Sequence, residues 1–118
     1  MPRFLLEVSY TSDAWAAQLE NPTNRPQAIK PALDAIGVKI ESSFFAFGES
    51  DIVAIVDAAD DVTAAALSLC ISASGVAKSV KTTPLMAMEE GIEAMRKAAR
   101  GLAVYPKLSK ALATAGKN

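Results

Sequence analysis

The sequence predicts an α+β fold in which helices cover one face of a four-stranded antiparallel sheet. Three observations support this class. Alternating apolar and polar residues open the chain, as in a half-buried strand. A short turn joins two further strand-like segments, which must therefore run antiparallel. Helical patterns separate the strands in the order β-α-β-β-α-β-α, which is a split βαβ repeat with one helix added.

The first strand is expected at residues 3–11, because every second side chain in it is apolar and most of the others are polar. A helix should follow at residues 15–19, since Ser12 and Asp13 offer side-chain oxygens that can accept hydrogen bonds at its N-terminus. The chain therefore opens with a strand whose apolar face is directed toward a core.

A second helical segment spans residues 26–36 and ends at Gly37, a residue that readily adopts the left-handed conformation found at helix C-termini. Pro31 lies within this segment. A proline inside a helix removes a backbone hydrogen bond and costs about 3 kcal/mol. The sequence therefore predicts that the helix either kinks at Pro31 or starts there.

The remaining strands are expected at residues 38–47, 52–56 and 76–85. The strand at 52–56 is almost wholly apolar, so it should be central and covered on both faces. The last strand contains Pro84, which cannot donate a ladder hydrogen bond, so this residue should lie at an edge of the sheet or at an end of the strand. Four such strands form the ferredoxin-like sandwich, whose expected strand order is 4-1-3-2.

Two more helices complete the expected domain. One spans residues 62–73 after a cap at Asp60 or Asp61, and another spans residues 88–100. The latter carries an apolar stripe that we expect to pack in the core. The stripe comprises Met88, Ile92, Met95, Ala99 and Leu102. Residues 1–100 should thus form one domain, and residues 101–118 form a basic tail with a helical pattern at 106–115.

Composition and residue counts limit the chemistry of one chain. The chain has 118 residues, of which 51% are hydrophobic, as expected for one globular domain. Histidine is absent, which excludes Ser-His-Asp and Cys-His mechanisms and histidine-ligated zinc or haem. We therefore expect neither a metal site nor a cofactor. Cys70 is the one cysteine; internal disulfides are excluded, and its apolar neighbours predict a buried structural thiol.

Hydropathy and charge favour a cytoplasmic protein without a membrane or nucleic-acid partner. The longest apolar stretch, residues 64–71, is too short for a transmembrane helix. Glu7 ends the first apolar run too early for a signal peptide. The net charge is −1, although residues 94–118 carry six of the 12 bases and no acid. A basic helix end with a solvated tail is favoured here over a nucleic-acid contact.

One face of the sheet lacks a helical cover, and this predicts a homo-oligomer. The side chains expected on that face are Leu5, Glu7, Ser9, Phe45, Phe47 and Lys81, with alternate residues of the third strand. An exposed apolar patch of this kind usually marks an interface. Two sheets packed face to face form a closed dimeric α/β barrel. Edge-paired trimers and a cover made by the third helix or the tail are the alternatives. Glu7 and Lys81 should pair across neighbouring strands.

Several segments resemble the GYD-domain family. The residues Phe47-Gly48-Glu49-Ser50-Asp51-Ile52-Val53 are similar to its hairpin, and the segments 4–11, 63–66 and 80–85 are similar to its first strand, second helix and fourth strand. The resemblance covers about residues 2–95 and implies the dimeric α/β-barrel type of ferredoxin-like fold. It implies little about activity, because the family is largely of unknown function.

The hairpin departs from the family pattern at one position. Ser50 stands where the family usually has tyrosine, so a ligand contact by that tyrosine would be missing here. Gly48 and Asp51 match. A turn that needs a positive φ explains Gly48, and hydrogen bonds from turn amides to the carboxylate explain Asp51.

Three classes of function are compatible with this sequence. The first is a non-catalytic small-molecule binding or sensing module. Its candidate ligand-binding residues are Tyr10, Trp15, Glu41, Phe45, Phe47 and Asp51. The second is a cofactor-free enzyme with Glu41, Glu7 or Asp51 as general base and with Tyr10 or Lys81 polarising a carbonyl. The third is a structural or adaptor subunit. The sequence favours the first class.

Overall fold

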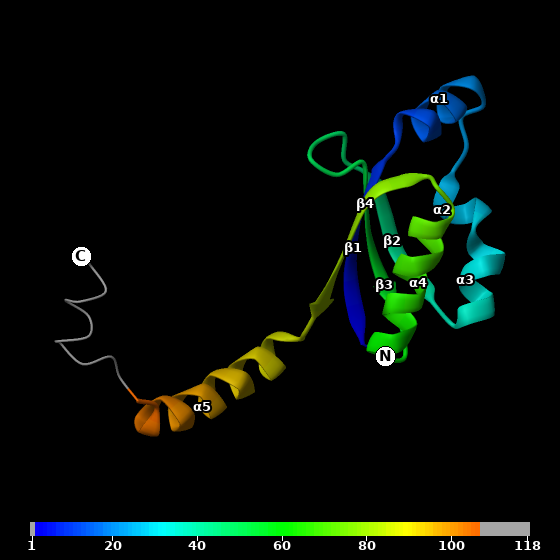
Figure 1. The fold of residues 1–118 in the computed structure, drawn as a ribbon. Helices are drawn as coiled ribbons and strands as arrows, with labels where there is room; N and C mark the ends of the chain where they lie inside the picture. The colour runs from blue at the N-terminus through cyan, green and yellow to red at the C-terminus, as the bar shows by residue number, and fades with distance from the viewer. Residues whose placement is uncertain (1, 107–118) are drawn as a thin grey trace, which may run out of the picture. The chain divides into compact units, whose positions relative to one another are not determined.

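The structure is a computed structural model that describes residues 2–106 (Figure 1). The elements in chain order are β1 (Arg3–Tyr10), α1 (Ser12–Glu20), α2 (Arg25–Ala28), α3 (Lys30–Ile36), β2 (Lys39–Phe45), β3 (Ile52–Asp57), α4 (Asp61–Ala73), β4 (Ala77–Leu85) and α5 (Met88–Val104). The chain divides after Leu85 into two compact units. The first unit holds the sheet and α1 to α4, and the second holds α5.

The four strands form one antiparallel sheet in the order β2-β3-β1-β4. This is the predicted ferredoxin-like order. The apolar strand β3 is central, and β4, which contains Pro84, lies at an edge as expected. The predicted α+β fold class is therefore confirmed.

Side chains of β1 alternate between the two faces of the sheet as the sequence predicts. Phe4, Leu6, Val8 and Tyr10 are all buried on the face that α3 and α4 cover (Figure 1). The same face receives Ile52, Ala54 and Val56 from β3, together with Leu33 from α3 and Ala64 and Leu67 from α4. Burial of these apolar surfaces drives the folding of this unit.

Local hydrogen bonds define where two helices begin. Thr11, rather than Ser12 or Asp13, caps α1, because its hydroxyl accepts from the backbone N–H of Ala14 at 3.1 Å. Asp60 caps α4 as predicted, and its Oδ1 accepts from Thr63 N at 2.8 Å. The hydrogen bonds from Thr63 hold the pKa of the Asp60 carboxyl below its ordinary value.

The segment around Pro31 consists of two short helices. α2 ends at Ala28, and Pro31 lies in the first turn of α3, where a missing N–H leaves no hydrogen bond unmade. The helix therefore starts next to this proline, which was one of the two predicted outcomes. Gly37 ends α3 with φ 76°, in the left-handed conformation expected for it.

A β-bulge in β2 changes which phenylalanine faces which side. The pairing with β3 shifts register at Glu41, which is an extra residue in β2. Phe44 consequently lies opposite Val53 on the face without helices, and Phe45 lies opposite the buried Ile52. The prediction that Phe45 lies on the face without helical cover is wrong, because it assumed unbroken alternation along the strand.

The face without helices, called the open face below, is partly apolar. Leu5, Val53 and Ile55 are half-buried there, and Phe44 is 65% exposed. Within residues 2–85, β3 is thus fully covered on one face only. Glu7 and Lys81 are directly opposite in the register, as predicted.

The ion pair expected between these two residues is not formed within residues 2–106. The Nζ of Lys81 instead lies 3.7 Å from the carboxylate of Glu49, in the loop between β2 and β3. Both of these side chains are mostly exposed, so this contact contributes little to stability. Glu7 therefore remains on the open face with no ion-pair partner among the described residues.

α5 is longer than predicted and is amphipathic. Glu89 and Glu90 lie in its first turn, which suits the helix dipole. Its residues are not buried, and Met88 at one end of the apolar stripe is 84% exposed. The expected packing of this stripe in a core stays a prediction. The helix predicted at 106–115 lies outside the described residues apart from residue 106.

Across residues 2–106, every helix is too short or too polar to cross a lipid bilayer. Cys70 corrects a second expectation, because it is exposed rather than buried. It lies on α4 beside the inward-facing Leu67 and Ile71, at the flank of the helix face that contacts the sheet. The apolar residues around Cys70 in the sequence predicted burial, but Cys70 lies beside a cavity that is described below.

Candidate functional site

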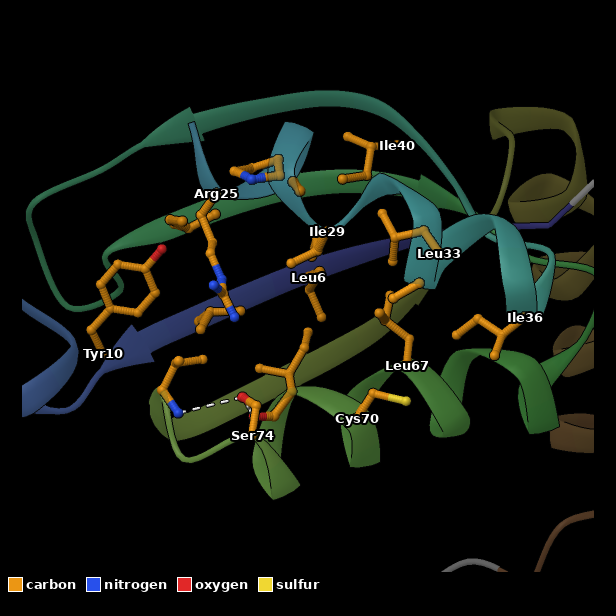
Figure 2. Close-up of a pocket in the computed structure, with 17 residues that line it drawn as sticks. Leu6, Tyr10, Arg25, Ile29, Leu33, Ile36, Ile40, Leu67, Cys70 and Ser74 are labelled. Carbon is orange, nitrogen blue, oxygen red and sulfur yellow. Dashed lines mark hydrogen bonds between the residues drawn. The ribbon is translucent and has the colours of Figure 1, made fainter. Parts of the chain in front are cut away.

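A cavity of about 210 Å³ lies between the helix-covered face of the sheet and the helices α2, α3 and α4 (Figure 2). Its walls are mainly apolar and include Leu6, Ile29, Leu33, Ile36, Leu67 and Ile71. A cavity of about 150 Å³ with such a lining is known to hold a benzene-sized molecule. The space in this protein is therefore sufficient for a small organic ligand.

Two polar side chains, Tyr10 and Arg25, lie at one end of this cavity (Figure 2). Tyr10 is the last residue of β1 and is 4% exposed, and its hydroxyl has no hydrogen-bond partner within residues 2–106. Arg25 is the first residue of α2 and is half-buried. The side chain of Asn24 fixes that start by accepting a hydrogen bond from Gln27 N at 3.1 Å.

Burial and charge act on the Tyr10 hydroxyl in opposite directions. Burial raises the pKa of this phenol above its ordinary value. The positive charge of Arg25 lowers the pKa and the carboxylate of Asp51 raises it, both by less than burial does. The net effect is a raised pKa, so the hydroxyl is protonated at neutral pH and can donate a hydrogen bond into the cavity.

Asp51 connects three parts of the chain close to this end. Its Oδ2 accepts from the backbone N–H of Tyr10 at 2.7 Å and from the indole Nε1 of Trp15 at 3.3 Å. Its own backbone N–H donates to the carbonyl of Val8 at 2.8 Å. The predicted hydrogen bonds to turn amides are replaced by bonds to β1 and α1. Asp51 thus attaches the β2–β3 loop to both elements.

Aromatic rings stack beside Asp51 at the same end of the sheet. Trp15 stacks on Phe47 with ring centroids 5.9 Å apart, and Phe47 stacks on Phe45 at 5.4 Å. Phe47 adopts φ 52°, and Gly48 is not among the glycines with positive φ. The explanation of Gly48 by a positive φ is therefore wrong. The left-handed residue is Phe47, whose ring is held by the stack.

Five of the six predicted ligand-binding residues come together near the β2–β3 loop: Tyr10, Trp15, Phe45, Phe47 and Asp51. Glu41 does not join them. It pairs with Arg3 at 3.0 Å, at the opposite end of β1 from Tyr10. Among the five, Tyr10 lines the cavity, and the other four residues do not. Whether these residues bind a ligand stays a prediction.

Sequence reasoning missed Arg25. Ile29, Leu33 and Ile36 form an apolar helical stripe in this segment, and all three line the cavity. Arg25 lies one helical turn before Ile29 and thus on the same inward-facing stripe. A charged residue in register with an apolar stripe is the signal that could have identified it.

The three candidate general bases do not line the cavity. The carboxylate of Asp51 already accepts two hydrogen bonds. Glu41 is ion-paired with Arg3, and Glu7 lies on the open face. Lys81, the other candidate for polarising a carbonyl, is also on the open face. Residues 2–106 contain no group of three or more histidine, cysteine or acidic side chains placed to hold a metal ion.

The fold and the site define a ferredoxin-like α+β protein with an apolar cavity under its helices. The chain belongs to the GYD-domain family, since the family model of the GYD domain matches residues 4–95. This match confirms the resemblance seen in the hairpin and neighbouring segments. No curated protein and no solved structure matches the chain.

Proposed function

We propose that this protein is a non-catalytic module that binds or senses a small molecule in the cavity under α3 and α4. The observation that carries the proposal is an apolar cavity with one polar end, at which a buried hydroxyl lacks a partner within the described chain. Sites for small molecules commonly combine apolar walls with a few convergent polar groups. A cytoplasmic location is part of this proposal.

Binding without turnover is favoured over a cofactor-free enzyme by the position of the acids. A general base must lie within hydrogen-bond reach of the proton that it removes. Glu7, Glu41 and Asp51 do not line the cavity, and each is placed or bonded elsewhere. A purely structural subunit is the less favoured alternative, since it gives no reason for a cavity of this size.

The proposal includes a homodimer assembled through the open face. Phe44 is exposed on this face beside the half-buried Val53 and Ile55. Covering such a patch with an identical sheet removes apolar surface from water on both copies. The same contact would cover β3 on its second face, as its apolar sequence leads us to expect.

Native mass spectrometry of the full chain, purified without added ligand, tests the binding site. We expect a dimer that retains a small-molecule mass. Cys70→Phe, which fills the cavity from its exposed flank, should lose that mass, whereas Leu69→Phe on the outer side of α4 should keep it. If wild type carries no added mass and no small apolar probe binds it more tightly than the Cys70→Phe variant, the binding function is wrong.

The assembly has a separate test. Phe44→Asp places a charge in the apolar part of the proposed interface, and we expect it to convert the dimer to a monomer in native mass spectrometry. Leu19→Asp is the matched control, because Leu19 is also mostly exposed but lies on α1. A Phe44→Asp protein that stays dimeric would contradict assembly through the open face and would favour edge pairing or α5.

A further inference from the structure

We propose that the ligand of this cavity is an apolar monocarboxylic acid whose carboxylate accepts hydrogen bonds from the Tyr10 hydroxyl and the Arg25 guanidinium. Its hydrocarbon part would lie against the apolar walls formed by residues such as Leu33, Ile36 and Leu67. This inference rests on the proposed function, since it names the class of molecule that the cavity binds.

The Tyr10 hydroxyl is the first observation. Within residues 2–106, two side-chain oxygens are buried without a hydrogen-bond partner, the Tyr10 hydroxyl and Asp57 Oδ1. Asp57 has the Nε of Arg3 at 3.8 Å, so its charge is partly compensated. Tyr10 has no comparable contact. Leaving a buried donor unpaired costs about 1–3 kcal/mol, and an acceptor on a ligand would remove that cost.

The second observation is the state of Arg25. Arg3 and Arg96 each pair with a carboxylate, at 3.0 and 3.4 Å. Arg25 has no ion pair and no side-chain hydrogen bond with the described residues, although it is half-buried. A guanidinium does not lose its charge at physiological pH. The charge of Asp51 also acts on this end of the cavity, but its carboxylate accepts from Tyr10 N and Trp15 Nε1 and forms no ion pair with Arg25. A direct anionic partner for Arg25 is therefore what the described chain lacks here.

The chemistry of the two donors favours a carboxylate. A guanidinium fork matches the two oxygens of a carboxylate, and the protonated phenol adds a third donor. One guanidinium and one neutral hydroxyl balance a single negative charge, which fits a carboxylate better than a doubly charged phosphate ester.

The remaining walls and the volume limit the rest of the molecule. A second charged group would contact mainly apolar side chains, where burying an unpaired charge is costly. At about 210 Å³ the cavity is somewhat larger than one of about 150 Å³ that holds benzene. The ligand should therefore be an acid with one aromatic ring or a short aliphatic chain.

Isothermal titration calorimetry at pH 7 with two matched pairs of probes tests this inference. Benzoate and hexanoate carry the charge, and benzamide and hexanamide are their neutral counterparts. We expect each acid to bind wild type at least tenfold more tightly than its amide. Arg25→Met should weaken acid binding at least tenfold and leave amide binding unchanged, and Tyr10→Phe should weaken acid binding several-fold.

Two further variants keep the test specific. Arg25→Lys retains the charge but not the fork, so it should bind the acids with an affinity between those of wild type and Arg25→Met. Lys30→Met removes a nearby surface charge that is paired with Asp34 outside the cavity, and it should bind all four probes like wild type. Circular dichroism on each variant checks that the fold is intact.

The outcomes separate this inference from the proposed function. If acids and amides bind equally and Arg25→Met and Arg25→Lys change neither, the acid class is overturned while the cavity remains a binding site. If none of the four probes binds wild type, the acid class is overturned, and the proposed function then depends on the native mass and the Cys70→Phe comparison described above.

Discussion

The backbone and the hydroxyl of Tyr10 differ in their hydrogen bonding. Its backbone N–H is bonded to Asp51 at 2.7 Å, and the same carboxylate oxygen accepts from Trp15. Its hydroxyl, at the other end of the side chain, is buried without a partner and faces the cavity with Arg25. The difference separates a structural network, which is complete within the chain, from a polar site that an added molecule would complete.

Removing the acceptor of the structural network should have the largest effect on stability. Asp51→Ala leaves the Tyr10 amide and the Trp15 indole without their acceptor, so we expect the free energy of unfolding to fall by about 2–3 kcal/mol. Urea denaturation at pH 7 measures it. Asp34→Ala, which removes an exposed ion pair with Lys30, is the control and should cost less than about 0.5 kcal/mol. Equal effects of the two variants would contradict the structural role of Asp51.

Removing one donor of the same network should have an intermediate effect. Trp15→Phe keeps an aromatic ring against Phe47 but deletes the indole N–H that Asp51 accepts at 3.3 Å. We expect a loss of about 1 kcal/mol in the free energy of unfolding, because Asp51 still accepts from Tyr10 N. A loss as large as that of Asp51→Ala would instead assign the stabilisation mainly to the Trp15 bond.

The raised pKa of Tyr10 should make stability fall at high pH. An unfolded tyrosine loses its proton near pH 10, whereas the folded one keeps it to higher pH. The unfolded state then binds fewer protons, so the free energy of unfolding decreases as the pH rises. This contribution is fully present below about pH 10 and is lost as the pH rises through the raised pKa of the folded state.

Denaturation between pH 9 and pH 11.5, on the order of the range over which tyrosine titrates, measures this dependence. Tyr10→Phe should lose stability less steeply with pH than wild type, because it lacks the titrating group. Tyr105→Phe, which removes an exposed phenol, is the matched control for the loss of one tyrosine. Identical slopes for wild type and Tyr10→Phe would show that burial does not perturb this hydroxyl.

No loss of stability is expected at the unpartnered end of Tyr10 at neutral pH. Tyr10→Phe removes a buried hydroxyl that makes no hydrogen bond within residues 2–106, and with it the cost of an unpaired donor, so the free energy of unfolding at pH 7 should rise by about 1 kcal/mol. Chemical denaturation without ligand measures it. A loss above about 1 kcal/mol would indicate that the hydroxyl has a structural partner.

Much of the fold could be predicted because its signals are periodic. The alternation of β1 identified its buried face, and the apolar run of β3 identified the central strand. Pro84 marked the edge, and the conflict at Pro31 anticipated the break between α2 and α3. These features depend on local backbone geometry and on period-two burial, which a single sequence records.

The candidate site was harder to predict, because it depends on contacts between distant segments. Asp51, Trp15 and Tyr10 were recognised as side chains with polar handles, but their mutual hydrogen bonds span up to 41 residues of sequence. Arg25 was missed since an arginine is exposed by default. Cys70 was assigned to the core because its neighbours in the sequence are apolar, and the sequence does not show that a cavity lies beside it.

The extra residue in β2 also has a consequence for how this sheet can diverge. Deleting Glu41 would restore unbroken alternation along β2 and leave Phe44 opposite Val53 and Phe45 opposite Ile52, because the bulge absorbs only the extra residue. Both rings would keep their sides, so Phe45 would still lie on the side where it stacks on Phe47. A gain or loss of one residue that no bulge absorbs would instead shift the register and exchange the two faces. Relatives with such a change in β2 should therefore redistribute their aromatic residues between the two faces.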